Sequence, residues 1–259
     1  MASTPPDTKV ITACIDGSAN TAAVCDAAAW AGRSIDAPIR FLHVVEPDSK
    51  STSGAGERLL EDTRDRAVAQ GALGVAVQQR HGRLVETLQT CEPETRLFVI
   101  GRRGVDNAGG DPVLGSQVEA VARTITRPIL TTVGVFEPPR RWMLAFDGSV
   151  VAATAVTRVA RSPILKGLPG HVVMVGEDTN VNRAQLEAAA ADLRTAGHVV
   201  TYHLLRGDVV DALLMFCRSA GVGLMVMGAF GHSRVRGFFV GSNTERMITR
   251  SAVPLLLLR

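Results

Sequence analysis

The stretch Gly228–Ser242, GAFGHSRVRGFFVGS, is the segment around which this chain is organised. It directly follows the apolar run VGLMVM at 222–227, which is typical of a buried strand, and it leads into a helix-compatible segment beginning at Asn243. Glycines between a strand and a helix let a ligand approach the backbone closely, and the amide groups at the helix start attract an anion. The stretch therefore predicts a phosphate-binding loop, with Ser242 and Asn243 as suitable helix N-cap residues beside it.

The same arrangement occurs earlier in the chain. Gly101-Arg102-Arg103-Gly104 follows the apolar run Leu97–Ile100, and Gly115-Ser116 comes later. Three more pairs of segments repeat at offsets of 125 to 131 residues: Asp16-Gly17-Ser18 with Asp147-Gly148-Ser149, His81–Leu88 with Arg206–Leu213, and Arg127–Leu130 with Val253–Leu256. A repeat of this length predicts two similar domains of ordinary size.

The two expected domains, 1–137 and 138–259, meet at the short proline-containing linker Glu137–Arg141. In each of them, continuous apolar runs alternate with amphipathic or alanine-rich segments. Strict alternation of strands and helices predicts an α/β fold with parallel sheets, helices on both faces and right-handed connections.

Ligands of such sheets bind beyond the carboxyl ends of the strands, where the strand order reverses. Asp147 and Gly228 both follow predicted strand ends in the second half, and Asp16 and Gly101 match them in the first. We therefore expect each half to place an aspartate and a glycine loop at one crevice.

Composition narrows the class of protein. The net charge of +3 argues against a dedicated nucleic-acid binder, which normally carries a strongly basic surface. The N-terminus, MASTPPDTK, lacks the apolar core of a signal peptide, and no apolar run approaches the roughly 20 residues that cross a bilayer. We expect a soluble, cytoplasmic protein that binds neither nucleic acid nor membrane.

The four cysteines show no paired or metal-ligand spacing, and we expect them to be small buried side chains in a reducing compartment. They are Cys14, Cys25, Cys91 and Cys217.

Gly228, Gly231, Gly241 and Ser242 form the pattern G-x2-G-x9-G-S. Together with the aspartate after the first strand and the final proline-hydrophobic strand, this pattern resembles the universal stress protein family. The resemblance covers nearly the whole chain, as a tandem form with two copies. It implies two Rossmann-like domains, each with a five-stranded parallel sheet.

The resemblance also implies that the second half binds ATP with Mg²⁺, with the phosphates on the glycine loop. Asp147 would then approach the ribose or a metal at the phosphates, and the Val175 backbone would meet adenine. The nucleotide-binding residues expected there are Asp147, Gly148, Ser149, Val175, Met227, Gly228, Gly231, His232, Ser233, Arg234, Gly241, Ser242 and Asn243. Two alternatives stay open: Asp147 as a turn or capping residue, and His232 as an exposed loop residue.

The first half departs from the family pattern. Its loop encloses ten residues between Gly104 and Gly115 rather than nine, Asp111 adds a carboxylate, and Pro112 lacks an amide donor. We expect weaker nucleotide binding here. The possible second nucleotide site comprises Asp16, Val44, Gly101, Arg102, Gly104, Gly115 and Ser116.

Three functions compete: an ATP-dependent regulator of a stress response, a slow ATP hydrolase and a nucleotide-free scaffold. The chain lacks the G-x4-G-K-[ST] loop of many ATPases, and we assign no catalytic residue. Mg²⁺ held near Asp147 would be part of the requirement for hydrolysis. The apolar last strands, Ile129–Val133 and Leu255–Leu258, predict an intramolecular pseudo-dimer, and a homodimer of whole chains is a further possibility.

Overall fold

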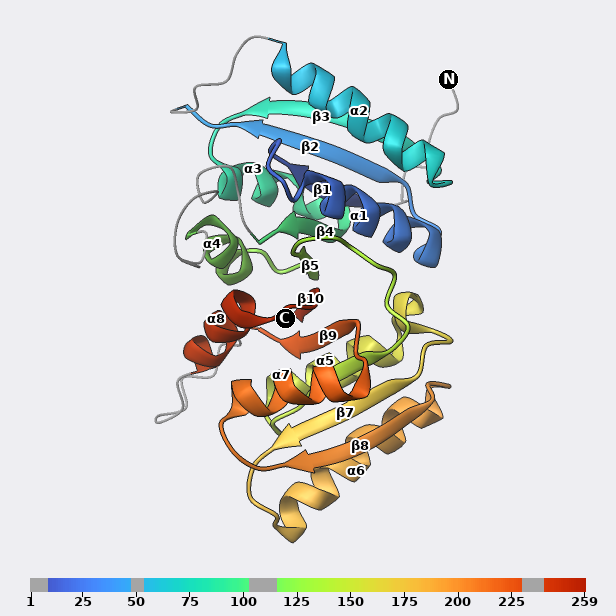
Figure 1. The fold of residues 1–259 in the computed structure, drawn as a ribbon, viewed down its shortest axis with the longest axis vertical. Coiled ribbons are helices and arrows are strands. Elements are labelled where there is room, and N and C mark those ends of the chain that lie inside the picture. Colours follow the sequence, from blue (N-terminus) through green and yellow to red (C-terminus); the bar gives the residue numbers. More distant parts are fainter. Residues whose placement is uncertain (1–8, 48–53, 103–115, 230–239) are drawn as a thin grey trace. The chain divides into compact units, whose positions relative to one another are not determined.

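The computed structural model describes residues 9–47, 54–102, 116–229 and 240–259 (Figure 1). Ser116 and residues 240–242 are described by their backbone alone. The chain divides into two compact units, Met1–Glu137 and Pro138–Arg259, and each unit is described by itself.

The described part of the first unit has five parallel strands in the order β3-β2-β1-β4-β5. Helices α1 and α2 pack against each other, and so do α3 and α4. Right-handed crossovers in opposite directions from β1 place the two helix pairs on opposite faces of the sheet. The elements are β1 (Val10–Ile15), α1 (Thr21–Ile35), β2 (Ile39–Val45), α2 (Ala55–Ala69), β3 (Val75–His81), α3 (Leu84–Cys91), a 3-10 turn (Glu92–Glu94), β4 (Thr95–Gly101), α4 (Ser116–Thr124) and β5 (Ile129–Thr132).

The second unit repeats this topology, with parallel strands in the order β10-β9-β6-β7-β8. Helix α5 contacts α6, and α7 contacts α8. The elements are β6 (Trp142–Ala145), α5 (Val150–Ala160), a 3-10 turn (Pro163–Leu165), β7 (Gly170–Val175), α6 (Asn180–Thr195), β8 (Val200–Leu205), α7 (Val209–Ala220), β9 (Leu224–Gly228), α8 (Val240–Arg250) and β10 (Leu255–Leu258).

Side-chain caps fix where helices of the second unit begin. The Ser149 hydroxyl accepts a hydrogen bond from the Ala152 amide at 3.2 Å, and the Thr179 hydroxyl accepts one from the Asn182 amide at 3.1 Å. A cap of this kind stabilises a helix by about 1 kcal/mol. Helix α1 of the first unit begins after Asn20, whose side chain does not cap it.

Each unit contains one tryptophan in its core. Trp142 is fully buried, its indole N–H donates to the Leu168 carbonyl at 2.9 Å, and its ring fills the space that a side chain on Gly170 would need. The first unit has Ile11 and Ile39 at the equivalent positions of its first two strands, so the same space is filled by two medium-sized side chains. Its own tryptophan, Trp30, lies on α1 with its ring 5.7 Å from that of Phe136.

The structure confirms the predicted α/β fold, with five parallel strands in each half. One local expectation was wrong. Helix α8 begins at Val240, so Ser242 and Asn243 lie inside its first turn and are not N-cap residues. The amide groups of this first turn have no partner within the helix itself.

Candidate functional site

The strand order of the second unit reverses between β6 and β9. From β6 the chain moves outward to β7 and β8, then crosses back to β9 on the other side. The carboxyl ends of β6, β7 and β9 therefore lie side by side, and they carry Asp147, Val175 and Gly228. This is the position at which open α/β sheets bind their ligands.

The Asp147-Gly148-Ser149 turn is built by local hydrogen bonding. Asp147 Oδ1 accepts from the Ser149 amide at 3.0 Å, and Gly148 has a φ of +75°, which residues with a Cβ rarely adopt. The side chain of Asp147 is exposed. Asp147 is thus a turn residue whose carboxylate also faces solvent, and the two interpretations from the sequence are compatible.

The first unit has the same turn. Asp16 Oδ1 accepts from the Ser18 amide at 3.0 Å, and Gly17 has a φ of +76°. Asp16 is also exposed. The two aspartates are therefore a matched pair, and any difference in ligand binding must come from the residues around them.

Gly228 is the last residue of β9, and it lies against the first turn of α5. A Cβ at Gly228 would lie 2.7 Å from Cγ1 of Val151, closer than real contacts allow. The structure therefore brings the start of the glycine loop against the helix that follows the aspartate turn. Met227, the residue before it, is buried and paired with Ala145 and Leu257, so its side chain belongs to the core.

Part of the expected phosphate loop lies outside the described residues, namely Gly231, His232, Ser233 and Arg234. The backbone of Gly241 and Ser242 lies in the first turn of α8, together with Asn243. Val175 is the last residue of β7 and pairs with Leu205 of β8.

An ion pair that the sequence analysis missed joins α7 to α8. Arg246 donates from Nη1 and Nη2 to the two carboxylate oxygens of Asp208, at 3.1 and 2.9 Å. Asp208 also caps α7 through the amides of Val210 and Asp211. The Arg246 hydrogen bond lowers the pKa of Asp208, and Asp208 raises the pKa of Arg246. This pair links α8 to the start of the neighbouring helix α7.

The crevice of the first unit is organised differently around Glu46, which follows β2. Glu46 Oε1 accepts from the Leu84 amide at the start of α3, at 3.2 Å. Its Oε2 accepts from Gln117 Nε2 in the first turn of α4, at 2.9 Å. A carboxylate therefore already contacts the first turn of the helix that corresponds to α8. The sequence carries one sign of this difference: aligning the two repeats places Arg83 in the first half opposite Asp208 in the second.

The other candidate residues of the first unit are distributed as follows. Gly101 ends β4 and pairs with Thr132, and Val44 lies near the end of β2, paired with Arg80. The side chain of Arg102 is buried, with 4% of its surface exposed. Ser116 begins α4, whereas Gly104 and Gly115 lie outside the described residues.

Within the described ranges, no three His, Cys, Asp or Glu side chains come together in an arrangement that could hold a metal. Mg²⁺ is often held by one or two carboxylates plus substrate phosphates, and the solvent-facing Asp147 fits the first of these roles.

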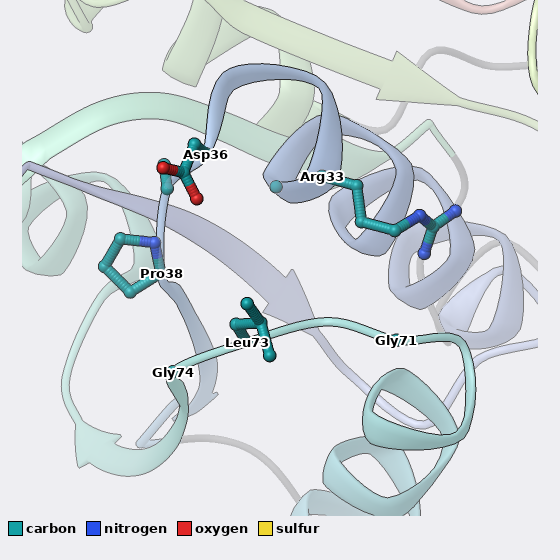
Figure 2. A pocket seen from close by; sticks show the side chains of 8 residues that line it. Arg33, Asp36, Pro38, Gly71, Leu73 and Gly74 are labelled. Atoms are coloured by element: carbon teal, nitrogen blue, oxygen red, sulfur yellow. The ribbon is translucent and has the colours of Figure 1, made fainter.

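Figure 2 shows a hollow at the opposite end of the first sheet, between the end of α1, the start of β2 and the α2–β3 connection. Arg33 and Asp36 border it, and Nη1 of Arg33 donates to the Gln70 carbonyl at 2.6 Å. It lies near the amino ends of the strands and is separate from the candidate site.

Comparisons with known proteins agree with this architecture. The family model described as the universal stress protein family matches residues 8–132 and 173–259, leaving out the turn at Asp147. "Universal stress protein Slr1230" of Synechocystis is 27% identical over 97% of this chain and 100% of its own length.

Two solved structures show the same fold over the whole chain. A universal stress protein from Archaeoglobus fulgidus has a TM-score of 0.76 at 20% identity, covering 96% of both chains. A putative universal stress protein from Pseudomonas aeruginosa has a TM-score of 0.72 at 14% identity, covering 97% of this chain and 93% of the other. In the described part of the chain, no helix is both long enough and apolar enough to span a membrane.

Proposed function

Because this chain belongs to the universal stress protein family, in a tandem form, we propose that it is a regulatory protein that binds ATP with Mg²⁺ mainly in its second half. The observation that carries the proposal is the meeting of the Asp147 turn, Gly228 and the crevice between β6 and β9. In this arrangement the nucleotide phosphates lie over the first turn of α8, whose amide groups and positive dipole end favour an anion. Asp147 contacts the ribose or a Mg²⁺ at the phosphates.

The experiment is a calorimetric titration of the full chain with Mg-ATP, Mg-ADP and AMP, comparing Asp147→Ala with Asp16→Ala. The two aspartates make the same turn, so each substitution removes the same local hydrogen bond. We expect Asp147→Ala to weaken ATP binding at least tenfold, because one charge-assisted hydrogen bond contributes about 1.5–3 kcal/mol. Asp16→Ala should have little effect. Equal losses in both variants would mean two working sites, and no binding by the unmodified chain would favour a nucleotide-free scaffold.

ATP turnover separates the regulator from the slow hydrolase. A regulator holds ATP with turnover near the background rate, so that the bound nucleotide controls shape or partners. Mass spectrometry of the small molecules released by denaturing the purified protein identifies the nucleotide it retains. Substantial turnover that disappears in Asp147→Ala would instead support the hydrolase.

A further inference from the structure

Two histidines of the second unit converge on neighbouring strands, away from the nucleotide crevice. His171 lies on β7, and His203 lies on the adjacent strand β8. His171 Nδ1 is 3.2 Å from His203 Nε2, 2.8 Å from Thr201 Oγ1, and Thr201 Oγ1 is 3.1 Å from His203 Nε2. Two ring nitrogens and a hydroxyl oxygen thus form one small triangle.

The spacing of this triangle suits a metal ion. Zinc binds histidine nitrogen at about 2.0–2.1 Å, and two ligands at octahedral or tetrahedral angles are then about 2.8–3.4 Å apart. The three observed separations lie in this range. Thr201 is exposed, and His171 and His203 are each partly exposed.

Phe216 of α7 fixes both rings, with ring centroids 5.3 Å from His171 and 4.7 Å from His203. The donor atoms are therefore held in place before any ion arrives.

The fold itself does not require this pair. By strand register, the first unit has Arg40 at the position of His171 and Gln78 at the position of His203. Arg40 there donates to Glu94 at 2.8 Å and to Thr12 at 3.0 Å, and the same strand pair is formed. Two histidines on β7 and β8 are thus a property of the second unit and not of the repeated architecture.

We propose that His171 and His203, with the exposed Thr201 hydroxyl as a third ligand, bind one divalent late transition-metal ion of the Cu²⁺ and Zn²⁺ class. Imidazole nitrogens are good ligands for these ions, with Cu²⁺ bound most tightly, whereas Mg²⁺ prefers oxygen ligands. Water molecules complete the coordination. The bound ion links β7 to the edge strand β8 and, through Phe216, fixes the face of the sheet that α7 covers.

The other cysteines and histidines of the described residues are held differently. His43 Nδ1 lies 2.9 Å from the Ile15 carbonyl oxygen. Burial raises the pKa of Cys14, Cys25 and Cys217 to about 12, which disfavours the thiolate that a metal needs. His198 is buried and bonded to the Val159 carbonyl at 3.1 Å. His81 is exposed at the end of β3 and serves as a control for binding to a single histidine.

The test uses the untagged, nucleotide-free full chain in a non-chelating buffer, titrated with Cu²⁺, Zn²⁺ and Mg²⁺. We expect one equivalent of Cu²⁺, weaker Zn²⁺ and no Mg²⁺ at the same site. His171→Asn and His203→Asn should each lower the Cu²⁺ affinity at least tenfold. Each should also remove one nitrogen ligand from the Cu²⁺ paramagnetic resonance spectrum, whereas His81→Asn should change neither quantity.

A double variant guards against misfolding. His171→Arg with His203→Gln installs the residues that the first unit uses at these positions, and its circular dichroism should match that of the unmodified chain. It should lose the Cu²⁺ site. The proposal is overturned if this variant or the single variants keep the original Cu²⁺ affinity and nitrogen signature, or if the unmodified chain binds Cu²⁺ no better than the double variant.

Discussion

The two halves share one topology and differ in the charges around their last helices, α4 in the first half and α8 in the second. In the second half, the acidic cap of α7, Asp208, is paired with Arg246 from α8. The first half has Arg83 and Ala120 at these two positions, and the carboxylate of Glu46 reaches the first turns of α3 and α4 instead. The start of α7 is thus paired with a cation from α8 in the second half, whereas an anion contacts the first turns of α3 and α4 in the first half. The repeated fold therefore places different charges at the same edge of its two sheets.

Substitution of the glycine at the start of α8 should have the largest effect on ATP affinity. Gly241→Val places a side chain in the phosphate approach, and we expect ATP affinity to fall roughly 100-fold, the equivalent of about 3 kcal/mol. Gly104→Val in the first loop should have a much smaller effect. Calorimetric titration of both variants decides it, and a larger loss in Gly104→Val would reverse the assignment of the two halves.

Removal of the Arg246–Asp208 pair should have an intermediate effect. Arg246→Ala loosens α8 from α7, and we expect ATP affinity to fall about threefold to tenfold, with only a small loss of stability because both groups of the pair are exposed. The matched control is Arg250→Ala, which removes the Arg250–Asp211 contact at the far end of α8. It should cost similar stability and leave the affinity unchanged. Equal affinity losses in both variants would show that helix packing, and not the position of Arg246, is responsible.

Neutralising the carboxylate in the first crevice should have a smaller effect, in the opposite direction. Glu46→Gln removes a negative charge beside α4, so we expect the first half to bind Mg-ATP a few-fold more tightly, measured in a Gly241→Val background. Glu177→Gln is the control, because Glu177 is the counterpart of Glu46 in the sequence repeat and its side chain is exposed. If the affinity of the first half for Mg-ATP stays the same after Glu46→Gln, its weak binding would be due to the glycine loop alone.

Cutting the chain in the linker should change least. The pairing of the halves through their last strands stays a prediction from the sequence, and a tether raises their effective concentration to roughly the millimolar range. We expect chains cut at Pro138 to remain associated in size-exclusion chromatography, with ATP affinity in the second half nearly unchanged. Separate, independently tumbling halves would contradict the predicted pseudo-dimer.

Apolar runs such as Leu255–Leu258 made the strands predictable, because a strand buried on both faces shows its state in its composition. The aspartate turns were predictable for a similar reason, since their hydrogen bonds join residues two positions apart. The side-chain contacts around the two crevices could not be predicted from the sequence. Arg246 and Asp208 are 38 positions apart, and Glu46 and Gln117 are 71 positions apart. Periodicity tells which face of a helix is buried, but it does not name the partner of a charged side chain.

The core tryptophans give each half its own fluorescence signal. The chain has two tryptophans, Trp30 in the first half and Trp142 in the second, both in packed surroundings. Each indole is a fluorophore whose emission moves to longer wavelength when unfolding exposes it to water. In a Trp30→Phe chain the signal reports the second half alone, and nucleotide or metal can be added to ask which half it protects from heat. Because each half has one tryptophan, the unfolding of two similar halves can be followed separately by fluorescence.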